Sequence, residues 1–148
     1  MTTNYVATMD PFPHQDKKFT KIYPFYDCLK QGRLVTTRCQ ECGHLTWPPK
    51  TMCPQCASAK IQWWDLPKEG TIVEYTVAER GIPAGFDIPT IFVLVQMGEV
   101  RILSRLMDAK PHQVDIGLAV LPGLVKVPGT PFSEERVLLV FKLKQNNN

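Results

Sequence analysis

The sequence contains no long apolar run. No stretch of its 148 residues approaches the roughly 20 apolar residues that a membrane-spanning helix needs, which excludes such a span from the expected fold. Residues Met1 to Asp16 have neither the basic start nor the apolar centre of a signal peptide, so we expect a cytoplasmic protein. Thirteen prolines favour loops and short strands over long helices.

The sequence also has little excess of one charge. The formal net charge is +3, and four zinc-bound thiolates would lower it to about +1. The basic residues are scattered, and no strand carries repeated exposed aromatic rings between basic residues. Binding to nucleic acid is therefore disfavoured, because it depends on a broad positive surface and on stacking rings.

Cysteine is scarce, but four of the five cysteines form a regular pattern. Cys39 and Cys42 make one CxxC pair, Cys53 and Cys56 make a second, and ten residues separate the pairs. A two-residue spacer lets both thiolates of a pair face one ion from a tight turn, and a hairpin brings the second pair opposite the first. We therefore predict one structural Zn²⁺ with four thiolate ligands in a zinc ribbon.

Other interpretations of this segment are weaker. Disulfides are disfavoured because nothing in the sequence indicates secretion, and a redox CxxC normally lies in a βαβ setting that is absent here. His44 adjoins the first pair and could be a ligand, but we expect its side chain to form a hydrogen bond in the turn instead. Four protein ligands would leave no open position for water or substrate, so catalysis by the metal is not expected.

A short helix is predicted before the ribbon. Pro24 suits its first turn and Gly32 its end, so it should run from Pro24 to Gln31. Phe25, Cys28 and Leu29 would share one face. Cys28, the fifth cysteine, is expected to be a small buried apolar residue, since no base lies near it in the sequence.

Five strand patterns follow the ribbon, and Gly98-Glu99 forms a tight turn between the second and third. The strands are predicted at residues 71–79, 90–97, 100–107, 117–127 and 137–144. A closed five-stranded barrel of the OB type accommodates them and removes exposed sheet edges. The fold class is thus mostly β. The expected divisions are an arm with a short helix (1–33), a zinc ribbon (34–66), a barrel (67–145) and a disordered tail (146–148).

Together these features resemble the acyl-CoA-associated OB-fold proteins that carry a rubredoxin-like zinc ribbon. The similarity extends from Tyr23 to Leu143. Its most specific residues are the Gly32-Arg33-Leu34 segment, Arg38 with the first CxxC pair and Gly43-His44, Pro48-Pro49, Cys53-Pro54-x-Cys56, Gly70 to Val73, Tyr75 to Val77, Pro89 and Ile116 to Val120. The hairpin tip from Gln96 to Arg101 departs from the family pattern.

The resemblance implies a small subunit of a heteromeric enzyme. Members associate with thiolase-fold proteins, often as heterotetramers with two copies of each chain, and the complexes act on acyl-CoA. One such complex cleaves benzoylsuccinyl-CoA to benzoyl-CoA and succinyl-CoA in anaerobic aromatic degradation. The resemblance therefore implies a zinc-containing accessory subunit of a coenzyme A-dependent thiolase or aldolase.

The residues of this chain do not supply the chemistry of thiolysis. That reaction needs a nucleophilic cysteine, a base, a second acid or base and an oxyanion hole. Only Cys28 lies outside the zinc pattern, and the three histidines, His14, His44 and His112, fall in three different segments. No nucleophile elbow, phosphate loop or paired carboxylate motif is present. We therefore predict no catalytic residue in this chain.

Two other groups of residues are candidates for binding. The apolar loop from Ile82 to Ile88 makes Phe86 and Ile88 candidate partner contacts, because long barrel loops commonly bind. Trp63 joins them, since adjacent tryptophans cannot both face one side of a strand. The basic residues Arg101, Arg105 and Lys110 are candidates for the phosphates of coenzyme A. A stand-alone acyl-CoA-binding protein and a nucleic-acid-binding ribbon and barrel remain the alternative functions.

Overall fold

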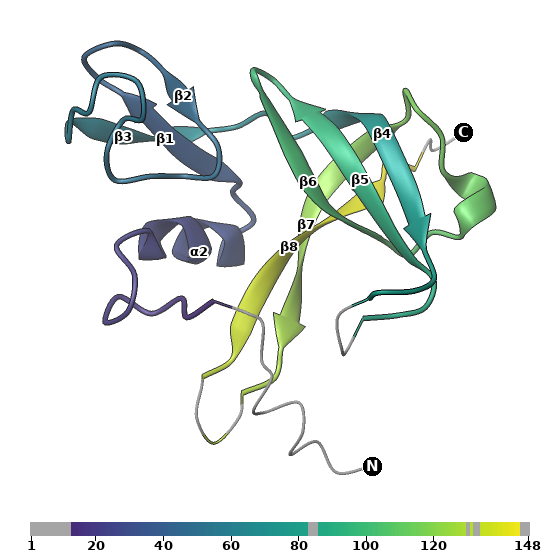
Figure 1. Cartoon of the computed structure of the whole chain (residues 1–148). Coiled ribbons are helices and arrows are strands. Elements are labelled where there is room, and N and C mark those ends of the chain that lie inside the picture. The colour runs from purple at the N-terminus through teal and green to yellow at the C-terminus, as the bar shows by residue number, and fades with distance from the viewer. Residues whose placement is uncertain (1–12, 83–85, 130, 132–133, 146–148) are drawn as a thin grey trace.

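The chain is predominantly β, as a computed structural model shows (Figure 1). The structure describes residues 13–82, 86–129, 131 and 134–145. The predicted tail (146–148) and residues 1–12 of the predicted arm lie outside the described residues. Nowhere in the described ranges does a helix have the length and apolar character to cross a membrane.

Helix α2 (Tyr23–Lys30) precedes the ribbon, one residue earlier than predicted. Pro24 lies in its first turn, where a missing N–H costs nothing. The chain turns away two residues after the helix, at Gly32, whose φ of +80° allows the N–H of Arg33 to reach the carbonyl of Cys28 at 2.9 Å. Phe25 and Leu29 are buried, so the predicted apolar face is confirmed.

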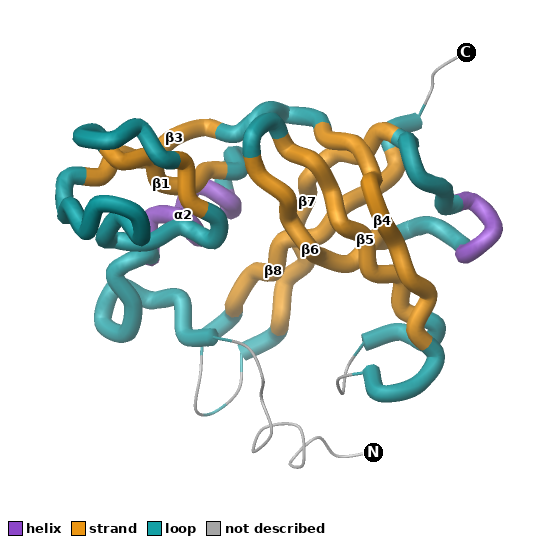
Figure 2. The backbone as a smooth tube through the Cα atoms, turned by 45° about the horizontal axis from the view of Figure 1, so that its top comes forward, coloured by secondary structure: helices purple, strands orange, loops and turns teal. Residues whose placement is uncertain are grey.

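The ribbon is a three-stranded antiparallel sheet with β1 in its centre. Strand β1 spans Val35–Cys39, β2 spans Leu45–Thr46 and β3 spans Ile61–Asp65. This sheet lies above α2 in Figure 1, and both views place it beside the barrel (Figures 1 and 2). An edge-on ring contact between Phe25 and Trp47, with centroids 5.7 Å apart, joins the helix to the ribbon. The apolar face of α2 therefore packs under the ribbon.

Five further strands close into the predicted barrel, in the order β4-β5-β6-β8-β7. They are β4 (Gly70–Ala78), β5 (Thr90–Met97), β6 (Val100–Met107), β7 (Ala119–Val127) and β8 (Arg136–Leu143). Only the β6–β8 pair is parallel. The β4–β7 pair that completes the ring is short, with Gly70 opposite Val120 and Thr71 opposite Ala119. A small Greek-key barrel of this type confirms the mostly β fold class.

Side chains of the central strands fill the barrel. On β5 the alternation places Val93, Val95 and Met97 inside with no exposed surface, and Phe141 of β8 is equally buried. Pro122 lies within β7, beyond the short pairing with β4 and opposite Phe141 of β8. A proline that lacks an N–H is tolerated there, because β7 has only one paired neighbour at that position.

Gly70 should be the least replaceable glycine of the barrel. An added Cβ would lie 2.3 Å from Met97 Sδ and 2.8 Å from the carbonyl oxygen of Gln96, and a backbone atom cannot move aside. We expect Gly70→Ala to lower the free energy of unfolding by about 1–3 kcal/mol in urea titrations, through overpacking.

Gly123→Ala provides the matched control, since its Cβ would only touch Val140 Cγ2 at 3.9 Å. Its effect should stay within about 0.5 kcal/mol. Equal stability of the two variants would contradict this account of β4 packing.

Candidate functional site

The four predicted metal ligands converge at one end of the ribbon. Cys39 ends β1, Cys42 lies in the turn toward β2, and Cys53 and Cys56 lie in the loop between β2 and β3. Their four Sγ atoms lie within 4.8 Å of one another. The Cys39–Cys56 and Cys42–Cys53 sulfurs are each 3.5 Å apart. Tetrahedral zinc with Zn–S bonds of about 2.3 Å places its sulfurs about 3.8 Å apart, so this set fits Zn²⁺.

Both CxxC pairs adopt the same turn. The N–H of Gly43 donates to the carbonyl of Cys39 at 3.0 Å, and the N–H of Ala57 donates to that of Cys53 at 2.9 Å. Both donors have a positive φ, +77° for Gly43 and +60° for Ala57. This conformation needs no compensation at glycine, whereas at alanine it is strained and must be stabilised by the surrounding structure.

The environment of the sulfurs prepares two of them for ionisation. A backbone N–H from Cys42 lowers the pKa of Cys39 to about 7, and one from Cys56 lowers the pKa of Cys53. For Cys42 and Cys56, backbone N–H groups of His44 and Ser58 favour the thiolate, but neighbouring thiols and burial together raise the pKa, to about 12 for Cys56. Four thiolates this close need a cation, which a dication such as zinc supplies.

Within the part of the chain that the structure describes, the donor set contains the four cysteines and no other residue. His44 lies beside the site and accepts a hydrogen bond from the N–H of Cys39 through its backbone carbonyl, at 2.9 Å. Four thiolate ligands close the coordination shell, so the chemistry of this donor set is that of a structural metal.

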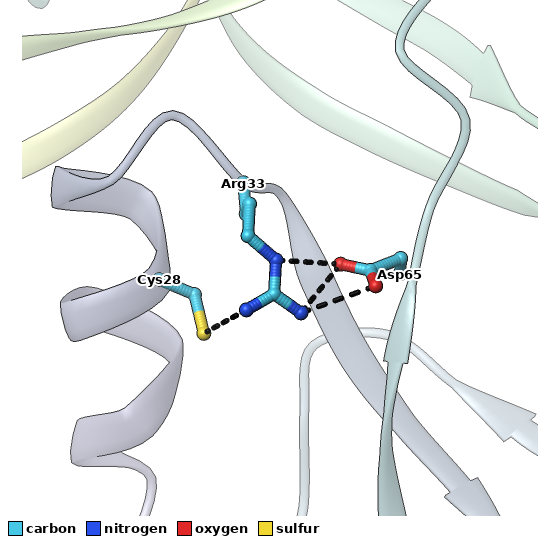
Figure 3. A network of polar contacts seen from close by, with 3 residues as sticks. All are labelled: Cys28, Arg33 and Asp65. Atoms are coloured by element: carbon cyan, nitrogen blue, oxygen red, sulfur yellow. Dashed lines mark hydrogen bonds and ion pairs between the residues drawn. The ribbon is translucent and has the colours of Figure 1, made fainter.

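Cys28 lies apart from the metal ligands, in a polar contact between α2 and the ribbon (Figure 3). Its sulfur is 3.9 Å from Nη1 of Arg33, whose other nitrogens hold the carboxylate of Asp65 at 2.9–3.1 Å. Cys28 packs against the core as predicted, but it is only half-buried and contacts a guanidinium, so the predicted buried apolar role is only partly correct. The Arg33–Asp65 fork joins the end of α2 to β3.

Phe86 and Arg105 meet on the outer face of the barrel. The Arg105 guanidinium carbon lies 3.8 Å from the centroid of the Phe86 ring, a cation–π contact. They border a shallow groove of about 280 Å³, whose other walls come from β5, β6 and β8. Those walls are Phe92, Leu103, Ser104, Leu138 and Leu139. We call this feature the Phe86 groove. Leu103 is 68% exposed and adds an apolar side chain to the wall of this groove.

A second hollow of about 260 Å³ lies on the other side of Arg105, where Asp87 and Asp108 line it. Burial lowers the pKa of Arg105, and the charge of Asp87 opposes this effect. Arg105 thus separates an apolar groove from a polar hollow.

The remaining predicted binding residues lie at separate positions. Ile88 follows in the Phe86 loop and is 73% exposed. Trp63 packs half-buried against the core, while its neighbour Trp64 is the more exposed ring. Arg101 donates to the side chain of Gln96 at 2.9 Å, and Lys110 precedes the short 3-10 helix η1 (Pro111–Gln113).

Sequence reasoning gave no role to Arg38, although it stands directly before Cys39. Its guanidinium donates to the carbonyl of Gly43 at 2.9 Å, pairs with Glu99 of the barrel and lies 4.5 Å from the Trp64 ring centroid. The available signal was an arginine adjoining a metal ligand, but nothing in the sequence indicated that Glu99 would be its partner.

The chain is similar to known zinc-ribbon proteins. Residues 29–62 match the family described as the ChsH2 rubredoxin-like zinc ribbon domain. A solved structure described as the Ltp2-ChsH2(DUF35) aldolase shares 28% identity, with a TM-score of 0.66, over 90% of this chain and 98% of that one. A DUF35-family protein of unknown function from Sulfolobus solfataricus, 19% identical with a TM-score of 0.55, shows the same fold. The predicted resemblance to zinc-ribbon, acyl-CoA-associated proteins is confirmed.

Curated relatives match a smaller part of their own length. A DUF35 domain-containing scaffold protein of Pyrococcus furiosus is 32% identical over 60% of this chain and 65% of its own. A probable enoyl-CoA hydratase alpha subunit of Thermomonospora curvata is 31% identical over 66% of this chain. The matched region spans only 31% of that longer protein.

The cysteine cluster predicts a clear effect of one substitution. Cys53→Ser should remove zinc and unfold the ribbon, because structural zinc contributes on the order of 10 kcal/mol to such small units. Metal analysis and thermal melting of the purified protein measure both effects.

Cys28→Ser is the control, since Cys28 lies outside the cluster, and it should keep one zinc per chain. Full zinc content together with an unchanged melt in Cys53→Ser would refute the four-cysteine site.

Proposed function

We propose that this chain, whose residues 29–62 match the ChsH2 rubredoxin-like zinc ribbon domain, is a zinc-containing accessory subunit of an enzyme that acts on acyl-CoA. The observation that carries the proposal is the similarity of 90% of the chain to a ChsH2(DUF35) structure described as an aldolase. The names of the curated relatives, a scaffold protein and a subunit of a probable hydratase, support the same role.

The placement of the reactive residues supports a role without catalysis. Cys28 contacts Arg33, and a guanidinium cannot take a proton from a thiol. His14 stacks on Phe19 in the segment before α2, His44 lies in the ribbon, and His112 lies in η1 beyond β6. A nucleophile with an adjacent base is therefore not assembled from these residues, and we assign the catalytic groups to the partner.

The finer proposal concerns the partner and its reaction. We propose a thiolase-fold partner in a heterotetramer with two copies of each chain. Such a complex would cleave a carbon–carbon bond near the thioester of an acyl-CoA, with benzoylsuccinyl-CoA as the first substrate to test. Arg101, Arg105 and Lys110 are our candidates for contacts with coenzyme A, since they are the basic residues of β6 and of the loop that follows it.

The partner surface that we propose is centred on the Phe86 groove. Its wall residue Leu103 is largely exposed, and Ile88 extends from the same loop as Phe86. Burial of apolar side chains by a partner is favourable because it removes them from water. Arg105, stacked on Phe86, is of a residue type that often anchors interfaces. Trp63 would contribute only at the edge of such a surface, because it is already half-buried.

Affinity capture of the tagged chain from native extract, with and without coenzyme A, tests the role of the chain directly. The proposal predicts recovery of an acyl-CoA enzyme subunit in a stoichiometric amount, identified by mass spectrometry. Recovery of the chain alone with tightly bound acyl-CoA would favour a stand-alone acyl-CoA-binding protein. Salt-sensitive recovery of nucleic acid would favour a nucleic-acid module, and either result would refute the accessory role.

The purified chain should have no thiolase activity. The predicted rate of coenzyme A-dependent cleavage of 3-oxoacyl-CoA equals the uncatalysed rate, and addition of the partner should raise it. Turnover by the pure chain, after removal of contaminating enzymes by a second chromatographic step, would place catalytic groups in this subunit.

Phe86→Asp should weaken association with the partner by at least about tenfold in Kd, because a charge would have to be buried in an apolar groove. Light scattering on the mixed proteins gives the complex mass, and metal analysis should still show one zinc per chain.

Ile116→Asp is the matched control. Ile116 is 56% exposed but does not line the Phe86 groove, so its substitution should leave the affinity unchanged. An unchanged complex mass for Phe86→Asp would exclude the groove as the partner surface.

A further inference from the structure

The side chain of Arg38 connects three separate parts of the molecule. Nη1 donates to the carbonyl oxygen of Gly43, in the first CxxC turn, at 2.9 Å. Nη2 forms an ion pair with the carboxylate of Glu99 at 2.5 Å. The guanidinium carbon lies 4.5 Å from the Trp64 ring centroid, on β3. One planar cation thus contacts the metal turn, the ribbon sheet and the barrel.

The position of Arg38 is more constrained than that of a surface cation. Its side chain is 21% exposed, whereas that of Glu99 is 67% exposed. Among the described residues its Nε is buried without a hydrogen-bond partner. An unsatisfied buried donor is costly, and an arginine free to turn toward water would avoid that cost. The contacts with Gly43, Glu99 and Trp64 therefore hold the guanidinium in place.

On the barrel side, Glu99 belongs to the tight turn between β5 and β6. A Cβ at Gly98 would lie 3.1 Å from Cγ of Pro67, so the turn rests on the chain that links ribbon and barrel. The Gln96 amide donates to the Gly98 carbonyl at 2.6 Å and supports the turn from the barrel. Glu99 is the residue through which this turn forms an ion pair with the ribbon.

Near the metal site, the CxxC turn fixes the direction in which the Gly43 carbonyl points. Gly43 follows the ligand Cys42 directly, has a φ of +77°, and donates its N–H to the carbonyl of Cys39 at 3.0 Å. Because many small metal domains fold only with their metal, we expect the turn to hold this carbonyl toward Arg38 in the zinc-bound form.

We propose that Arg38 couples metal loading of the ribbon to the β5–β6 turn of the barrel. In the zinc-bound form the Gly43 carbonyl and the Trp64 ring fix the guanidinium, which then holds Glu99. Loss of the metal releases both. The zinc therefore fixes how the ribbon sits against the barrel, in addition to folding the ribbon. This inference rests on the cysteine site and is independent of the proposed enzymatic partner.

Hydrogen exchange read by mass spectrometry tests this coupling on the full chain. Peptides covering residues 96–101 are compared with zinc bound and after chelation, in the wild type and in Glu99→Gln. We expect chelation to speed exchange at the turn about threefold to fivefold in the wild type. In Glu99→Gln the turn should already exchange fast with zinc bound, and chelation should add little.

Glu41→Gln is the matched control. It removes the same charge and an exposed ion pair with Lys60, 3.4 Å long, inside the ribbon itself. Exchange at residues 96–101 should respond to zinc in this variant as in the wild type. All three proteins should bind one zinc per chain, because Glu99 and Glu41 are not metal ligands.

An equal response to chelation in the wild type and in Glu99→Gln would overturn the proposal, since the signal would then pass through other contacts such as Pro67. No response in the wild type would overturn it as well. If chelation unfolds the whole barrel, the test becomes a comparison of exchange rates between the two zinc-bound variants. Faster exchange at residues 98–100 in zinc-bound Glu99→Gln than in zinc-bound Glu41→Gln supports the coupling, and equal exchange refutes it.

Discussion

The close approach of four thiols at one end of the ribbon is the constraint on which the rest of this structure depends. The ribbon sheet has only five residues in each long strand and two in β2, too few to bury a core of its own. The sulfurs lie within 4.8 Å of one another. Four thiolates at this spacing repel one another, and a bound dication makes the arrangement favourable. The docked helix and the contacts of Arg38 both require the strands that this site organises.

The two parts of the chain contribute different properties to the proposed accessory role. The barrel strands enclose an apolar core that α2 and the ribbon also join, and the barrel presents an apolar groove at Phe86. The ribbon obtains its stability from metal and meets the barrel through the Arg38–Glu99 ion pair and through Leu34, Val35 and Leu66, which belong to the same apolar cluster as the barrel residues. A subunit built in this way provides a defined surface to a partner, and the catalytic groups can then belong to the partner alone.

The sequence predicted most of the fold because its signals are local. Tight turns and alternation placed residues 90–97 and 100–107 as strands, and the structure has the same limits. The spacing of the cysteines likewise predicted their convergence, since two turns and a hairpin determine it. Pro24 and Gly32 indicated α2 to within one residue.

Contacts between segments that are far apart in the sequence could not be predicted from the sequence. The pairing of Arg38 with Glu99 spans 61 positions and depends on how the ribbon docks on the barrel. The stack of Arg105 on Phe86 similarly depends on where the loop after β4 returns. Alternation indicated that only one of two adjacent tryptophans could be buried, and we assigned Trp63 to a partner surface. The packing of β3 instead makes Trp63 the more buried ring and Trp64 the more exposed one.

Native mass spectrometry of the complex purified from its source is the most direct test of the accessory-subunit account. The account predicts one particle that contains this chain and an acyl-CoA enzyme subunit in equal numbers, with one zinc ion for each copy of this chain. A particle that contains only this chain, or a stoichiometric complex without zinc, would contradict it.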